Sequence, residues 1–287
     1  IVVKGGKLNG LRPLIQDLDS LPYTDRELFY KEKDQSIMNF ITQRGCPYDC
    51  SYCFNHAFKN MFKGQKFVRS HSVDYVINEI LDAMKNYNIK FIRFVDDNFI
   101  LRDIKWLKEF SVKYKKEIGI PFYIHARFDL MTPKIAGLLK DANCKVIQMS
   151  IESPNYELRK KVLGRNMTDE EIFRGVKYAL ESGINILAYS MLGIPNSIIK
   201  DDINAIDFCI RAGIKVCEFP IYQPFPKTKL GDLCKDNKWL DKNISEIDMG
   251  NKKISVLNCF SQSEKNIQLN ISHLGTIAIK YPYLRNL

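Results

Sequence analysis

The sequence predicts an α/β fold, a partial (β/α)6 TIM-like barrel with an N-terminal linker and a short C-terminal extension. Between residues 37 and 228, six short apolar segments rich in β-branched and aromatic residues alternate with segments of helical periodicity. Strands that are apolar along their whole length are typical of a parallel sheet covered by helices. Because helical crossovers between parallel strands are right-handed, six such units curl into a partial barrel.

The first 36 residues differ from the barrel pattern. Residues 2–4, the glycine pair at 5–6 and Asn9-Gly10 predict a short hairpin. The proline-punctuated run from Leu11 to Tyr30 predicts an extended linker that packs on a domain surface. The chain begins with Ile1 rather than Met, so we expect residues 1–36 to follow a missing upstream domain.

The barrel elements follow in order over residues 37–228. The predicted strands are residues 37–42, 90–95, 122–126, 145–151, 184–192 and 216–222. The predicted helices are residues 72–87, 104–117, one beginning at Thr132-Pro133, 168–182 and 199–212. Proline after a capping threonine favours the third helix start, and the capping box Thr168–Glu171 favours the fourth. Periodicity weakens beyond this region, and residues 229–287 are expected to form an extension of helices and turns.

Composition limits the partners and the compartment. The 43 Lys and Arg residues against 33 Asp and Glu give a net charge of +10, but the charge is spread along the chain. The sequence has no nucleic-acid-binding signature, so we expect no nucleic acid partner. No apolar stretch approaches the roughly 20 residues of a membrane span, and no signal peptide is visible. With three of eight cysteines close together, these features favour a metal site in a cytoplasmic protein.

Cys46, Cys50 and Cys53 have the spacing C-x3-C-x2-C and directly follow the first predicted strand. Active sites of such barrels lie at the carboxyl ends of the strands. Thiolates suit zinc or an iron–sulfur cluster. Structural zinc usually takes four ligands, and His56 can supply a fourth, so a zinc-binding interaction module stays open. On a four-iron cluster, three thiolates leave one iron open to a substrate. The remaining cysteines are expected to be buried apolar residues: Cys144, Cys209, Cys217, Cys234 and Cys259.

The motif resembles the C-x3-C-x-aromatic-C of the radical S-adenosylmethionine superfamily, with Tyr52 as the aromatic residue, and the resemblance spans about residues 36–228. It implies a 4Fe-4S cluster on the three cysteines, with S-adenosylmethionine bound to the open iron. It also implies reductive cleavage to a 5′-deoxyadenosyl radical, with an electron donor such as flavodoxin or ferredoxin. Tyr52 is expected near the adenine.

Motifs at the other strand ends resemble the family's cofactor-binding segments. Asp96 and Asp97 stand where the family binds the amino group of S-adenosylmethionine. The segment ending in Glu152 resembles G-x-E-S, with Ser150 in place of Gly, and implies that Glu152 binds the ribose. Arg165 is expected at the methionine carboxylate.

Two further turns complete the resemblance. Met191, Gly193 and Pro195 belong to a G-x-P-like turn expected to contact adenine, although the usual acidic residue is absent after Pro195. The segment ending in Thr228 resembles P-x-P-G-T, with Lys227 in place of Gly. Arg127 either faces the site or pairs with Asp129. The sequence nominates no further catalytic side chain.

The D-D-x-F form at residues 96–99 and the run at residues 11–26 resemble the cobalamin-binding (class B) branch. This implies a truncated enzyme that methylates an unactivated centre of a small-molecule substrate, with cobalamin bound mainly by the missing upstream domain. Two alternatives within the family are an anaerobic oxidative cyclase and a tRNA methylthiotransferase-like enzyme. The positive charge suits the second, but its usual extra cysteine ligands and RNA-binding domain are not visible.

Overall fold

The computed structural model describes residues 3–4, 7–8, 10–30, 36–240 and 254–283. Its centre is a six-stranded, all-parallel sheet with the strand order β10-β9-β8-β7-β6-β3. The strands are β3 (Ile37–Phe40), β6 (Phe91–Phe94), β7 (Phe122–Ala126), β8 (Cys144–Glu152), β9 (Asn185–Ser190) and β10 (Val216–Glu218). Within this sheet, strands that follow one another along the chain also lie side by side, as expected for consecutive β/α units.

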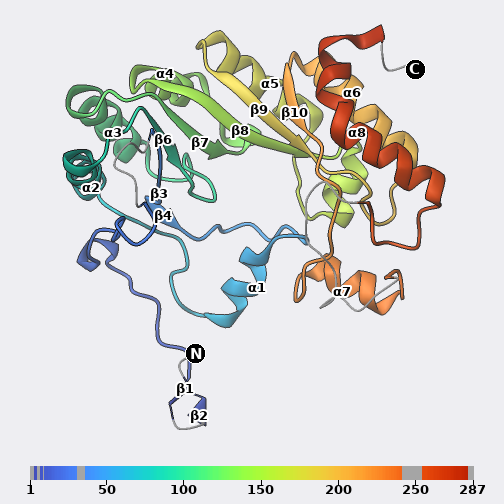
Figure 1. The fold of residues 1–287 in the computed structure, drawn as a ribbon, viewed down its shortest axis with the longest axis horizontal. Coiled ribbons are helices and arrows are strands. Elements are labelled where there is room, and N and C mark those ends of the chain that lie inside the picture. The colour runs from blue at the N-terminus through green and yellow to red at the C-terminus, as the bar shows by residue number, and fades with distance from the viewer. Residues whose placement is uncertain (1–2, 5–6, 9, 31–35, 241–253, 284–287) are drawn as a thin grey trace.

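Helices follow the strands and pack on one side of the sheet (Figure 1). They are α2 (Val73–Asn86), α3 (Ile104–Glu117), α4 (Pro133–Asp141), α5 (Asp169–Glu181) and α6 (Ile199–Ala212). The predicted capping residues are in place: Thr132 accepts from the Ile135 amide, and Thr168 and Glu171 form a capping box. All five helices begin within one residue of their predicted starts, and the four with a predicted end finish within one residue of it.

The core lies between the sheet and these helices. Alternate strand residues such as Phe94, Phe122 and Ile124 are fully buried there. The Phe94 ring lies 5.4 Å from Phe122 and 5.6 Å from Phe110, each in edge-to-face geometry. Such pairs add about 0.5–1.5 kcal/mol each to the burial of their apolar area.

Some predicted strands are shorter in the structure. β10 ends at Glu218, before Pro220, and only an isolated bridge from Leu192 to Ile221 continues the pairing. Proline has no N–H to donate to a strand ladder, and Pro220 follows the end of β10 by two residues.

Several elements were not predicted. They are β4 (Gln43–Arg44), which pairs with β5 (Arg69–Ser70), and α1 (Phe54–Met61) directly after the cysteines. A π-helix at Leu158–Val162 was also not predicted. The extension contains α7 (Lys229–Asp236) and α8 (Gln262–Lys280), in agreement with the helices expected there. In Figure 1, α8 lies alongside α6.

The hairpin predicted at the start of the chain is present as β1 (Val3–Lys4) paired antiparallel with β2 (Lys7–Leu8). The linker then packs against the start of α2. The Asp19 carboxylate accepts the Ser72 N–H (3.0 Å), and the Tyr75 hydroxyl donates to the Leu21 carbonyl (3.1 Å). Within the described residues, no helix is both long and apolar enough to cross a membrane.

Candidate functional site

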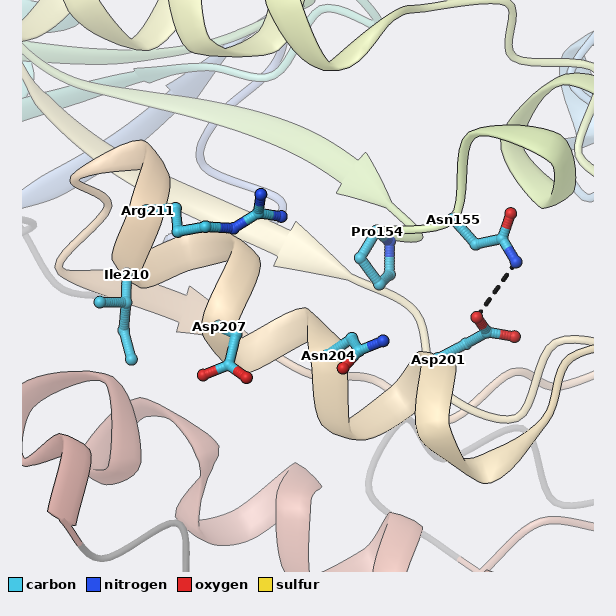
Figure 2. Close-up of a pocket in the computed structure, with 7 residues that line it drawn as sticks. All are labelled: Pro154, Asn155, Asp201, Asn204, Asp207, Ile210 and Arg211. Atoms are coloured by element: carbon cyan, nitrogen blue, oxygen red, sulfur yellow. Dashed lines mark hydrogen bonds between the residues drawn. The ribbon is translucent and has the colours of Figure 1, made fainter.

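One surface pocket, of about 610 Å³, lies apart from the predicted site residues. Figure 2 shows it between α6 and the segment after β8. Part of its polar lining already forms a hydrogen bond within the protein, because the Asn155 side-chain amide donates to Asp201 at 3.1 Å. None of the residues nominated from the sequence lines this pocket.

The cysteine loop is held in place through Ser51. Its amide donates to the Leu163 carbonyl (2.9 Å), and its hydroxyl donates to the Val162 carbonyl (2.7 Å). The Ser51 carbonyl accepts the Leu230 amide at 2.9 Å. Because Ser51 lies between Cys50 and Tyr52, these long-range bonds orient both residues.

Gly45 provides the backbone conformation with which the chain enters the cysteine loop. It has φ +89°, and a Cβ at this position would lie 2.6 Å from the Phe67 carbonyl oxygen. A side chain would therefore be strained by the backbone conformation and would also collide with fixed backbone.

The three cysteines lie near one another, so that Cys50 bears electrostatically on both Cys46 and Cys53. Cys50 is buried, whereas Cys46 and Cys53 are half-buried. Burial raises the pKa of Cys46 to about 11 and also raises the pKa of Cys53. The thiols of Cys46 and Cys53 are thus protonated at neutral pH, and a bound metal must displace these protons.

Three thiolates suit a four-iron cluster with one open iron, whereas structural zinc would need His56 as a fourth ligand. His56 Nδ1 donates to the Cys53 carbonyl oxygen at 2.7 Å, so one ring nitrogen is used within α1. In the part of the chain that the structure describes, no three His, Cys, Asp or Glu side chains gather around a single-ion site. A four-iron cluster needs no such common point, because each thiolate binds a different iron.

Tyr52, Glu152 and Arg165 form a connected group beside the cysteines. The Tyr52 hydroxyl donates to Glu152 Oε1 at 2.7 Å, and the Arg165 guanidinium lies 3.8 Å from the same oxygen. Arg165 also donates to the Ser150 carbonyl at 2.9 Å. Burial alone would lower the pKa of Arg165, but Tyr52 and Glu152 outweigh it and raise that pKa. Arg165 therefore stays charged, and Glu152 has a permanent cation beside it.

Burial, reinforced by the charge of Glu152, raises the pKa of Tyr52 well above its usual value. The phenol therefore stays a neutral donor. Glu152 itself has φ +67° and follows an irregularity in the β8–β9 pairing. This backbone conformation changes the direction of the Glu152 side chain at the carboxyl end of β8. There the Met191 amide donates to the Glu152 carbonyl at 2.7 Å.

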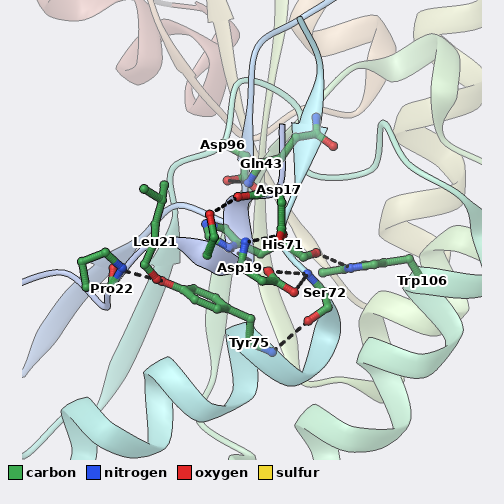
Figure 3. Close-up of polar contacts among 11 residues, drawn as sticks. Asp17, Asp19, Leu21, Pro22, Gln43, His71, Ser72, Tyr75, Asp96 and Trp106 are labelled. Atoms are coloured by element: carbon green, nitrogen blue, oxygen red, sulfur yellow. Dashed lines mark hydrogen bonds and ion pairs between the residues drawn. The ribbon is translucent and has the colours of Figure 1, made fainter. Parts of the chain in front are cut away.

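The adjacent acids Asp96 and Asp97 have different surroundings. Asp96 is buried, accepts the Thr42 and Gln43 amides at 2.6 and 2.9 Å, and pairs with Arg102 at 2.9 Å. Asp96 and Gln43 lie beside the linker contacts of Asp19 and His71 (Figure 3). The oxygens of Asp96 are thus used to hold the turn after β3.

Asp97 instead faces the cysteines. Asn55 donates to its carboxylate at 2.8 Å and also approaches Cys53 Sγ at 3.7 Å. Sequence reasoning missed Asn55. Its position two residues after the last cysteine was the only available signal.

The predicted adenine turn is held by two helices. The Gly193 amide donates to both oxygens of Asp202 on α6 (3.1 and 3.2 Å), and Gln268 on α8 donates to Asp202 at 3.0 Å. Gly193 has φ +63°, and a Cβ there would lie 3.0 Å from Gln268. Neither Asp202 nor Gln268 was nominated from the sequence.

The same turn adjoins the cysteine loop through a second apolar cluster. Met191 and Ile194 are buried in it, and Tyr52 packs against it. The structure thus brings Tyr52, Glu152, Arg165 and the turn at residues 191–195 together, with the cysteines and Asp97 alongside.

Two smaller expectations are resolved. Arg127 pairs with Asp129 through two bonds of 2.9 and 2.8 Å, and it also lies 3.8 Å from the centre of the Tyr48 ring. Lys227 has φ +63°, the conformation that favours glycine at this position, and Thr228 caps α7.

Comparison with known proteins identifies relatives. The family model of the radical SAM superfamily matches residues 40–209. An uncharacterised methyltransferase of Pyrococcus horikoshii is 28% identical over 234 residues, which are 80% of this chain and 50% of that protein. Cytidylyl-2-hydroxyethylphosphonate methyltransferase of Streptomyces wedmorensis is 23% identical, covering 84% of this chain and 48% of that protein. The chain spans about half the length of these curated relatives.

A similar solved structure is the radical S-adenosylmethionine methyltransferase TsrM of Kitasatospora setae, which contains cobalamin and a 4Fe-4S cluster. It superposes with a TM-score of 0.59 at 17% identity, over 82% of this chain and 46% of that chain. At this sequence identity, the structural similarity supports only a shared fold. Together with the parallel sheet order, it confirms the predicted partial barrel.

Proposed function

Because the chain belongs to the radical SAM superfamily of enzymes, we propose that Cys46, Cys50 and Cys53 hold a 4Fe-4S cluster beside a site for S-adenosylmethionine. The main support is the hydrogen-bonded group of Tyr52, Glu152 and Arg165, which links the cysteine loop to the carboxyl end of β8. When bound and reduced, such a cluster supplies the electron that breaks the sulfonium C–S bond.

Glu152 and Arg165 bind opposite parts of the cofactor in this proposal. The Glu152 carboxylate accepts from the ribose hydroxyls, while Tyr52 and Arg165 orient it. Arg165 Nε is buried and has no hydrogen-bond partner among the described residues, which leaves it a donor for the methionine carboxylate.

Asp97 and the turn at residues 191–195 complete the site. Asp97 faces the cysteines and binds the cofactor's amino group, whereas Asp96 acts as a positioning residue. Met191, Gly193 and Pro195 contact adenine next to Tyr52, where the cluster of buried apolar side chains excludes water.

The reaction that we propose is cobalamin-dependent methylation of an unactivated centre in a small molecule. Two curated relatives are named methyltransferases, and TsrM was solved with cobalamin bound. The cobalamin is held mainly by a segment outside residues 1–287. A low-potential carrier such as flavodoxin or ferredoxin supplies the electron. Methyl transfer is favoured over oxidative ring closure because the relatives named methyltransferases match 80% and 84% of this chain, whereas a relative named a cyclase matches 57%.

The test is S-adenosylmethionine cleavage by anaerobically reconstituted protein under chemical reduction. Wild-type protein and a Cys259→Ala control, changed at an exposed cysteine outside the loop, should both form 5′-deoxyadenosine. Cys50→Ala should form none and should lose the iron–sulfur absorbance near roughly 400 nm. Cleavage by Cys50→Ala at the wild-type rate would exclude it as a ligand.

A further inference from the structure

The cysteine loop is anchored unevenly along its length. Its second half is held by the backbone hydrogen bonds of Ser51 to the segment after β8 and to α7. Among the described residues, by contrast, no backbone–backbone hydrogen bond reaches residues 46–49, which we call the Cys46 arm. The Lys59 ammonium binds this arm at Asp49 (2.6 Å), but the Asp49 side chain is 56% exposed. Because exposed ion pairs contribute little to stability, this pair does not fix the arm.

A buried arginine of the barrel contacts the Cys46 arm. Arg127 directly follows β7, is 6% exposed, and lies with its guanidinium carbon 3.8 Å from the centre of the Tyr48 ring. The same guanidinium donates to Asp129 from Nε at 2.9 Å and from Nη2 at 2.8 Å. Such a two-point bond fixes the plane of a guanidinium, and a cation is attracted to an aromatic ring more strongly where water is excluded. The Arg127–Asp129 pair therefore holds the Tyr48 ring against the barrel.

The turn that carries Arg127 and Asp129 has a fixed place in the fold. Phe128, between them, is 1% exposed. A Cβ on Gly175 of α5 would collide with the Phe128 carbonyl oxygen, so the helix backbone lies directly against this turn. The contact with Tyr48 thus joins the Cys46 arm to the packed core of sheet and helices.

Tyr48 in turn acts on Cys46. The Tyr48 amide donates a hydrogen bond to the Cys46 sulfur, which lowers the pKa of that thiol against the larger effect of burial. Hydrogen bonds to the sulfurs are among the ways in which a protein tunes an iron–sulfur cluster. Because the ring and the amide belong to one residue, holding the ring also holds the direction of the amide. The position of Cys46 therefore depends on Arg127, with Tyr48 between them.

We propose that Arg127 and Asp129 are positioning residues for the iron–sulfur cluster, which hold the Cys46 arm in its metal-binding conformation through the Tyr48 ring. The alternative is that the pair stabilises only its own turn, in which case the Tyr48 ring is dispensable. The geometry favours the first role, because the guanidinium lies over the ring while two of its nitrogens bind Asp129. This inference rests on the proposed function, because it concerns the cluster of the same site.

The rate of iron release tests this role in the loaded protein. Anaerobically reconstituted protein is mixed with an excess of a ferrous chelator, and the loss of cluster absorbance is followed. Tyr48→Leu removes the ring but keeps the ion pair, and it should release iron at least about tenfold faster than wild-type protein. Arg127→Gln should do the same. The double variant should be no faster than either single variant, because both changes remove one contact.

Two controls retain the contact. Tyr48→Phe keeps the ring and should release iron at the wild-type rate, as should Tyr283→Leu at an exposed tyrosine outside the loop. Hydrogen exchange of the metal-free protein is the second measurement. There the amide of residue 48 should exchange at least about tenfold faster in Tyr48→Leu and in Arg127→Gln. Because Tyr48 is only half-buried, Tyr48→Leu should keep the wild-type urea midpoint.

Wild-type rates of iron release and amide exchange in Tyr48→Leu would overturn the inference, and so would equally fast release from Tyr48→Phe. A lower urea midpoint in Tyr48→Leu would also overturn it, because general stability would then explain the faster release. The proposed function fails separately: wild-type protein that takes up no iron and sulfide would reject the cluster. Faster exchange at residue 48 in the metal-free variants would still support the contact between Arg127 and the Cys46 arm.

Discussion

Glu152 has an unfavourable backbone conformation, and its carboxylate lies beside a charged and a polar side chain. A non-glycine residue at φ +67° costs on the order of 1–3 kcal/mol, yet here it also carries a carboxylate beside Arg165 and Tyr52. Strain of this kind is kept where a specific side chain is needed at that point of the chain. The position at the end of β8 makes cofactor binding the best account of that need.

Replacing Glu152 with Gln tests this role. The change keeps the shape but removes a charged acceptor, and hydrogen bonds to charged groups contribute about 1.5–3 kcal/mol. We expect the Kd for S-adenosylmethionine, measured by calorimetry, to rise at least about tenfold, with the cluster absorbance unchanged. Glu157→Gln, an exposed acid five residues later, serves as the matched control and should bind normally. An unchanged Kd in Glu152→Gln would remove this residue from the site.

At the scale of elements, α6 and α8 act together on one turn. Asp202 and Gln268 are 66 positions apart, and both are almost fully buried against Gly193. Burial raises the pKa of Asp202 to about 7, while the Gly193 and Gln268 donors oppose that rise. Asp201 on α6 and Glu264 on α8 add to it through their negative charge.

The raised pKa of Asp202 predicts a specific pH dependence of stability. Its folded-state value of about 7 lies above the ordinary 3.8, so the folded protein binds this proton more tightly. The resulting stabilisation is complete below about pH 3.8 and is lost as pH rises through 7. Between pH 5.5 and 8, the urea midpoint of wild-type protein should therefore fall relative to that of Asp202→Asn.

An Asp236→Asn control, at an exposed position on α7, should keep the wild-type slope. If Asp202→Asn loses as much stability as wild-type protein over this pH range, Asp202 is not the titrating group.

The sequence was sufficient for the elements whose pattern is local. Buried strands such as β7 and capped helices such as α5 appear as apolar runs and capping boxes, and both were predicted to within one residue. α1 was missed because it has eight residues, and its apolar Phe54 and Met61 face solvent rather than a core. Helices this short are marginal by themselves and depend on their surroundings.

The site residues likewise divide into those that a local sequence pattern reveals and those that it does not. Its cysteines and Glu152 stand in contiguous motifs, so the sequence could nominate them. The Asp202–Gln268 pair depends on a contact between distant segments, which no local pattern encodes. The different surroundings of Asp96 and Asp97 likewise appear only once Thr42 and Arg102 are placed.

At the scale of the whole molecule, the barrel brings together segments from residue 46 to residue 268 at one end of the sheet. Ser51 joins the cysteine loop to the segment after β8 and to α7, and Gln268 joins the C-terminal helix to the adenine turn. Binding of a cofactor here should therefore stabilise the barrel and the extension together.

The central claim is that the three cysteines hold an iron–sulfur cluster rather than a single ion. Its most direct test is metal and sulfide analysis of the chain after anaerobic reconstitution with iron, sulfide and an equal supply of zinc. We expect about four irons and four sulfides per chain. About one zinc per chain without sulfide would contradict it.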